Sequence, residues 1–207
     1  MSAAGRPRIP ERAEAQRTRI LDAAQKCFIE QGFHAASMAT IAETAQMSAG
    51  LIYRYFESKH AIVLAIIARE LGRSRERIAA LHTCVDLTSA LLDAFRDLKS
   101  VEAMGMNAAL HLETSAEATR VTEIGAAVRD ADAQTRAEFA AFLMRPVAEG
   151  GLGMGSADAQ RRALAMQIIV GGLVLRAART PGVGARELRQ ALEPLVATLV
   201  GEPAPAA

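Results

Sequence analysis

The 207-residue chain contains no tryptophan, and aromatic residues make up only 4% of it. Strands favour aromatic and β-branched residues, which are few here, whereas alanine, the strongest helix former, is frequent. The sequence therefore predicts an all-α fold. Hydrophobic residues account for 51% and charged residues for 23%, a balance typical of globular chains of one or two domains.

The chain also lacks the features of membrane-spanning, secreted and metal-binding proteins. No apolar run approaches the roughly 18 residues that span a bilayer, and residues 1–10 contain no hydrophobic signal segment. Cys27 and Cys84 lack C-x-x-C spacing and lie among apolar residues, so we expect both to be small buried side chains. These absences predict a cytoplasmic protein, with flexible tails at residues 1–10 and 202–207.

Catalytic motifs are missing as well. The four histidines are scattered, and no H-E-x-x-H, P-loop or G-x-S-x-G pattern occurs. We therefore expect no enzyme activity, no catalytic residue, no metal site and no cofactor. The 24 Lys and Arg nearly balance the 23 Asp and Glu, so any nucleic-acid binding must come from a local patch. Residues 1–60 carry eight basic and six acidic side chains, a modest local excess.

Helical periodicity extends along most of the chain, with glycine-rich breaks at residues 150–156 and 180–184. The predicted helices cover residues 11–31, 38–45, 49–56, 59 into the eighties, 86–99, 101–118, 119–148, 157–178 and 185–200. Gly32 is a stop signal for the first of them, and Ser37, Ser48 and Ser58 are good N-caps for the next three. Two short helices joined by a tight turn indicate a helix-turn-helix. The residues expected to face the core in this region are Ile20, Ala24, Cys27, Phe28, Gln31, Met38, Ile41, Ala42, Ala45, Ile52, Phe56, Ile62, Val63, Ile66 and Ile67.

A set of motifs in this region is shared with a known family. They are Arg19-Ile20-Leu21-Asp22-Ala23-Ala24, Phe28, Gly32-Phe33, Ser37, Ile41-Ala42, Ala45 and Ser48-Ala49-Gly50-Leu51-Ile52-Tyr53-Arg54-Tyr55-Phe56-Glu57-Ser58-Lys59. On these motifs, residues 17–67 resemble the DNA-binding domain of the TetR family of bacterial transcriptional regulators. The resemblance implies a three-helix helix-turn-helix domain over residues 14–74, with the motif at about 37–56. A helical ligand-binding and dimerisation domain over 75–201 would follow, giving about nine helices in total.

The residue types at the start of the second short helix suit a DNA groove. Small side chains let the backbone approach base edges, and tyrosine hydroxyls can reach phosphates. Lys59 opens the next helix, where the helix dipole disfavours a cation, so we expect a phosphate beside it. The predicted DNA-binding residues are Ser37, Thr40, Ser48, Ala49, Gly50, Leu51, Tyr53, Arg54, Tyr55 and Lys59. In the resemblance, Ala49, Gly50 and Leu51 lie against bases, whereas Ser37, Tyr53, Tyr55 and Lys59 contact the DNA backbone.

The sequence departs from the family pattern at three positions. Ala39 stands where Arg or Lys is frequent, and Leu51 replaces a common Thr, Ser or Ala, which suggests an apolar contact to a base. Gln46 replaces the usual glycine of the turn and must adopt its geometry at some cost. Taken singly, the tyrosines could be ordinary core or surface aromatics, and the serines could be caps only.

The second half carries no motif with chemistry of its own, so its site residues are predicted by type and place. Flexible and aromatic side chains of the central helices suit an apolar or amphipathic inducer; they are Phe95, Met104, Met106, Asn107, His111, Phe139 and Phe142. Ordinary core packing explains the same residues. A homodimer interface is expected around the mid-helix pair Gly171-Gly172, where glycine is costly unless another backbone comes close; its residues are Met166, Ile169, Val170, Gly172 and Leu173. A tight contact within the chain is the alternative.

The sequence thus predicts a DNA-binding transcriptional regulator. We expect a ligand-responsive repressor that binds a palindromic double-stranded operator as a dimer, with an unidentified small-molecule inducer. A helical ligand-binding or adaptor module that does not recognise an operator is the alternative.

Overall fold

The computed structural model describes residues 9–81, 87–100, 107–180 and 182–201. This part of the chain contains nine α-helices, one short 3-10 helix and no strand, which confirms the all-α prediction. The chain divides into two compact units, Met1–Ile66 and Ile67–Ala207. The division falls inside the fourth helix, which also contains the domain boundary predicted at residues 74 and 75. Within the described residues, no helix is long and apolar enough to cross a membrane.

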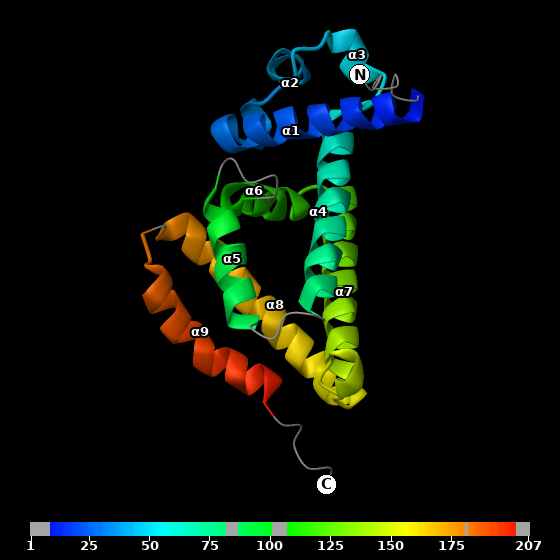
Figure 1. Cartoon of the computed structure of the whole chain (residues 1–207). Coiled ribbons are helices and arrows are strands. Elements are labelled where there is room, and N and C mark those ends of the chain that lie inside the picture. Colours follow the sequence, from blue (N-terminus) through cyan, green and yellow to red (C-terminus); the bar gives the residue numbers. More distant parts are fainter. Residues whose placement is uncertain (1–8, 82–86, 101–106, 181, 202–207) are drawn as a thin grey trace, which may run out of the picture. The chain divides into compact units, whose positions relative to one another are not determined.

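The first unit consists of α1 (Ile9–Ala35), α2 (Met38–Thr44), α3 (Ala49–Tyr53) and the beginning of α4 (Lys59–Leu81). Gly32 interrupts α1 with a positive φ of 79°, as its predicted role as a stop signal requires. α2 packs against both α1 and α3, and Figure 1 shows the two short helices on the same side of α1.

A small aliphatic and aromatic core holds these helices together. Phe28 of α1, Ile41 of α2, Ile52 of α3 and Ile62 of α4 each expose 1% or less of their surface. Of the side chains predicted to face this core, all are buried except Gln31, which is exposed, and Met38, which is partly exposed. Gln31 lies one residue before the break at Gly32, so the helical stripe that begins at Ile20 has ended there.

The cysteine of the first unit, Cys27, lies in its core. The Cys27 thiol is buried, and its sulfur lies 3.2 Å from the Thr44 hydroxyl of α2, so it packs as a small core side chain. Cys84 falls outside the described residues.

The second unit contains the rest of α4 together with α5 (Leu87–Lys99), α6 (Ala108–Ala118), α7 (Thr122–Met144), η1 (Val147–Glu149), α8 (Ser156–Arg179) and α9 (Ala185–Val200). α7 packs against α6 and α8, while α5 packs against α8 and α9. α7 ends at Met144 rather than at the predicted residue 148, because Pro146 disfavours helical backbone at Arg145. The predicted start of the sixth helix, at residues 101–106, lies outside the described residues.

Candidate nucleic-acid interface

Two serine caps fix where the short helices begin. The Ser37 hydroxyl accepts a hydrogen bond from the Thr40 backbone N–H at 3.0 Å and shares a second one with the Thr40 hydroxyl at 2.8 Å. The Ser48 hydroxyl accepts from the Leu51 N–H at 3.3 Å and starts α3 in the same way. The predicted capping role of both residues is therefore confirmed, and both side chains remain exposed at the helix ends.

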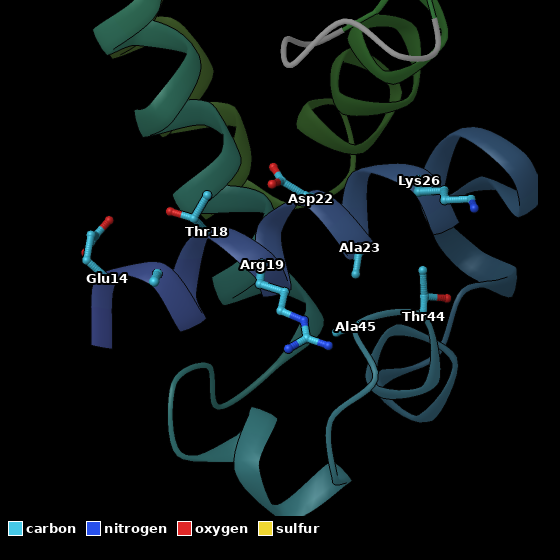
Figure 2. Close-up of a pocket in the computed structure, with 9 residues that line it drawn as sticks. Glu14, Thr18, Arg19, Asp22, Ala23, Lys26, Thr44 and Ala45 are labelled. Atoms are coloured by element: carbon cyan, nitrogen blue, oxygen red, sulfur yellow. The ribbon is translucent and has the colours of Figure 1, made fainter. Parts of the chain in front are cut away.

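The turn between α2 and α3 depends on a strained glutamine. Among the described residues other than glycine, only Gln46 has a positive φ, of 52°. This left-handed conformation costs an L-residue about 1–2 kcal/mol, as expected for a residue in the place of a glycine. Its side-chain oxygen accepts a hydrogen bond at 3.2 Å from Arg19 of α1. Figure 2 shows the Arg19 side chain reaching from α1 toward the chain at Ala45.

The same face of α1 borders an open groove with mixed charge. Two carboxylates, Glu14 and Asp22, alternate with two cations, Arg19 and Lys26, around it. The four side chains carry two positive and two negative charges, so the groove has no net charge. The clearest structural role of Arg19 is its hydrogen bond to Gln46.

α3 has a buried side and an open side. Ile52 is fully buried, and Phe56 just beyond the helix is 3% exposed, so these two side chains anchor α3 to the core. Ser48, Ala49, Gly50 and Arg54 are exposed, Leu51 is partly exposed, and Tyr53 exposes 55% of its surface. A Cβ atom at Gly50 would meet no atom within 4 Å, so none of the residues that the structure describes packs against this position. α3 thus presents small side chains, with a tyrosine and an arginine beside them, to the solvent.

Arg17 of α1 contributes a contact that the sequence reading missed. Its guanidinium carbon lies 4.4 Å from the centre of the Phe56 ring, and it approaches the Tyr55 carbonyl oxygen at 3.5 Å. Tyr55 itself is half-buried. Arg17 therefore ties α1 to the segment that follows α3. No signal in the sequence pairs these residues, because 38 positions separate Arg17 from Tyr55.

Lys59 has contacts within the chain that its position at the start of α4 did not indicate. Its ammonium group donates hydrogen bonds to the carbonyl oxygens of Phe33, of His34 at 3.3 Å and of Ala36 at 2.8 Å, and lies 4.5 Å from the centre of the Phe33 ring. These carbonyls end α1, where a cation is favourable. They account for a lysine at the start of α4 without a phosphate. The structure thus gives Lys59 a positioning role between α1 and α4.

In the second unit, the three phenylalanines predicted for the pocket belong to one hydrophobic core. Phe95, Phe139 and Phe142 are 4–7% exposed, and the last two rings lie 5.7 Å apart. Asn107 is buried as the N-cap of α6, where its side-chain oxygen accepts from the Leu110 N–H at 3.0 Å. Met104 and Met106 lie outside the described residues.

His111 of α6 is the titratable member of this set. Burial lowers the pKa of the imidazole below its ordinary value; nearby Glu70 acts in the opposite direction, and Arg77 lowers the pKa further. Glu70 lies on α4, where its carboxylate oxygens are 3.8 Å from Arg73 and 3.2 Å from Arg77. The imidazole therefore adjoins a small polar cluster inside a largely apolar domain.

The predicted dimer residues divide into buried and exposed positions. Met166 and Leu173 are 6% and 5% exposed and pack in the core of their own chain, so little of their surface is left for a partner. Val170 and Gly172 are exposed, and Ile169 is partly buried against the core. A Cβ atom at Gly171 or Gly172 would meet nothing within 4 Å, which excludes the alternative of a tight contact within the described chain.

Comparisons with known proteins agree with this architecture. Residues 20–66 match the family model for bacterial regulatory proteins of the tetR family. The transcriptional regulator UidR of Escherichia coli K12 is 36% identical over 143 residues, covering 67% of this chain and 69% of UidR. The transcriptional repressor KstR of Rhodococcus jostii is 39% identical over 62 residues, covering 30% of this chain and 29% of KstR.

Solved structures extend the likeness beyond the helix-turn-helix. The structure of Salmonella enterica GusR aligns with a TM-score of 0.72 and 26% identity, over 90% of this chain and 95% of GusR. The similarity to UidR likewise covers two thirds of both sequences. The chain therefore belongs to the TetR family and is a DNA-binding transcriptional regulator.

Proposed function

We propose that this protein is a ligand-responsive repressor that binds a palindromic operator as a homodimer. The observation that carries the proposal is the open side of α3, where Ser48, Ala49 and Gly50 are exposed while Ile52 fixes the helix to the core. A helix with a small leading end can approach base edges in the major groove. The relative KstR is named as a repressor, which supports the same role here.

On the open side of α3, residues fall into two kinds of proposed contact. Ala49, Gly50 and Leu51 would face base edges, and Leu51 would meet an apolar group such as a thymine methyl. Tyr53, Arg54 and Tyr55 would reach phosphates, together with Ser37, Thr40 and Ser48 at the helix starts. Lys59 would act through the arrangement of α1 and α4 instead of through a phosphate of its own.

An exposed apolar stripe on α8 supports the homodimer. Leu164, Ile168 and Leu175 expose 47%, 68% and 41% of their surfaces. Together with Gly171 they recur every three or four residues, so they share one face of the helix. The open space at Gly171 would let a second copy of α8 come close. In a dimer bound to a palindrome, the two α3 helices would occupy half-sites about 34 Å apart, one turn of DNA.

The ligand response would arise in the second unit. The inducer would bind among Phe95, Phe139 and Phe142 and meet two polar side chains, those of Asn107 and His111. Such a mainly apolar composition suits a small organic molecule. A solved structure of the same fold contains choline, so this architecture can hold a small organic molecule. An inducer releases DNA only if it binds one conformation of the regulator more tightly than the other.

Selection of random duplex DNA by the purified full chain tests the proposal. We expect enrichment of a palindrome and steep weakening of binding as salt rises. The variant Ile168→Glu should be monomeric in analytical ultracentrifugation and should no longer select a palindromic sequence. Val147→Glu is the matched control, since Val147 is 73% exposed and lies outside α8. Selection without a palindrome, or a dimeric Ile168→Glu, would overturn the proposed mode of binding.

A further inference from the structure

A groove of about 570 Å³ lies between α5 and the beginning of α9, on the second unit. Its volume falls within the usual range of small-molecule sites. None of the residues proposed above for DNA contact lies in it, and only Phe95 is shared with the proposed inducer pocket. The residues lining it are Ser89, Leu92, Asp93, Phe95, Arg96, Lys99, Val183, Ala185, Arg186, Leu188 and Arg189.

The charge around this groove is strongly one-sided. Four cations line it, namely Arg96, Lys99, Arg186 and Arg189, against the single carboxylate of Asp93. The second unit as a whole has no such excess, because residues 67–207 contain 16 basic and 17 acidic side chains. The positive charge is therefore concentrated at the groove.

Arg96 and Arg189 pair with carboxylates at the surface. The Asp93 carboxylate lies 2.9 Å from Arg96, and both side chains are more than 60% exposed. Arg189 lies 3.8 Å from Glu193 and donates to the Ser89 hydroxyl at 2.9 Å. Exposed pairs of this kind contribute little stability, so a ligand anion can compete with them.

The position of Arg186 is not explained by contacts of the kind that hold Lys59. It lies in the first turn of α9, where the helix dipole disfavours a cation. Lys59 occupies a similar place on α4 but is held by three carbonyl oxygens. Among the described residues, Arg186 makes no hydrogen bond or ion pair, although it lines the groove. An anion in the groove would offset its unfavourable position.

The floor of the groove is apolar. Phe95 and Leu188 expose 4% and 7% of their surfaces, and Leu92 and Val183 are partly exposed beside them. Water reaches the apolar lining mainly at Leu92 and Val183. A small inorganic ion would leave these two side chains in contact with water, whereas an aliphatic body would cover them. We propose that the α5–α9 groove is a binding site for a small organic anion, an aliphatic carboxylate with its charge at the arginines and its chain on Leu92 and Val183. This site goes beyond the proposed function and does not depend on it.

The absence of tryptophan from the chain allows a local probe of this groove. In the full-length variant Leu92→Trp, the only indole would lie at the groove, and its fluorescence can be followed during titration with octanoate. We expect saturable binding of octanoate and little response to inorganic phosphate or octylammonium. Retention of helical far-UV circular dichroism checks that the variant folds.

Charge reversal then assigns the anion to the arginines. Adding Arg186→Glu should weaken octanoate binding about tenfold or more, because an attraction becomes a repulsion. Arg129→Glu is the matched control, since Arg129 is an exposed arginine of α7 outside the groove, and it should leave the affinity unchanged. No saturable response, an equal response to octylammonium or phosphate, or equal effects of the two reversals would overturn the proposal. Operator binding, measured on the same proteins, tests the proposed function separately.

Discussion

Lys59 offers the sharpest test of how the DNA-binding unit is built. The variant Lys59→Met keeps the aliphatic stem and removes the ammonium that joins the end of α1 to the start of α4. Three carbonyl oxygens lose a charged donor, and the Phe33 ring loses a cation 4.5 Å from its centre. Hydrogen bonds from charged donors contribute about 1.5–3 kcal/mol each when buried, and an exposed cation–π contact about 0.5–1 kcal/mol.

Solvent access reduces this total. Lys59 is only partly buried, so water can donate hydrogen bonds to the three carbonyl oxygens in place of the ammonium. We therefore expect Lys59→Met to lower the free energy of unfolding of the first unit by about 2 kcal/mol. Lys26→Met is the matched control: Lys26 lies 4.0 Å from Glu30, and both side chains are at least half exposed. Loss of such a pair should cost less than about 0.5 kcal/mol.

Urea unfolding followed by tyrosine fluorescence isolates the relevant unit. The chain has two tyrosines and no tryptophan, and both tyrosines, Tyr53 and Tyr55, belong to the first unit. A loss of stability for Lys59→Met no larger than that for Lys26→Met would refute the positioning role.

Salt dependence of operator binding separates positioning from direct phosphate contact. Each phosphate contact adds about 0.9 to the slope of log affinity against log salt. Lys59→Met should weaken binding on every sequence, because α1 and α4 are held less firmly, yet leave this slope unchanged. A slope reduced by about one unit would show that Lys59 neutralises a phosphate, contrary to this reasoning.

Three further outcomes are expected. Gln46→Gly should raise the free energy of unfolding of the first unit by about 0.5–1 kcal/mol, because glycine tolerates the positive φ. Gln46→Ala should lower it, because alanine keeps the strain and loses the hydrogen bond from Arg19. Urea unfolding measures both effects. Leu51→Ala should change base preference at one or two operator positions without altering non-specific affinity, as selection from random DNA would show. The pKa of His111 is lowered by burial, so the unfolded chain binds more protons and stability should fall as pH drops below the ordinary value of 6.5. His111→Gln should reduce that pH dependence in circular-dichroism denaturation curves, and an unchanged profile would contradict the assignment.

Local chemistry made much of the fold predictable from sequence. The caps at Ser37 and Ser48, the interruption at Gly32 and the strained turn at Gln46 each depend on residues a few positions apart. Helical periodicity likewise gave the ends of α8 and α9 to within two residues. Several helix ends were misplaced: α1 extends to Ala35 and α3 stops at Tyr53, against predicted ends at 31 and 56. At α7 the cause was local, since Pro146 stops the helix four residues before the predicted end.

Contacts between distant residues decided the roles that sequence could not assign. Lys59 donates to carbonyl oxygens 23–26 positions earlier in the chain, and reasoning from its own helix dipole does not reveal these contacts. α8 carries apolar residues on two sides, and its periodicity does not say which side the chain itself covers. Packing against α5 and α7 buries Met166 and Leu173 and leaves Ile168 and Leu175 exposed. The sequence by itself thus determined the helices and the family, because both reside in short-range patterns; tertiary packing alone decided which faces are free to bind.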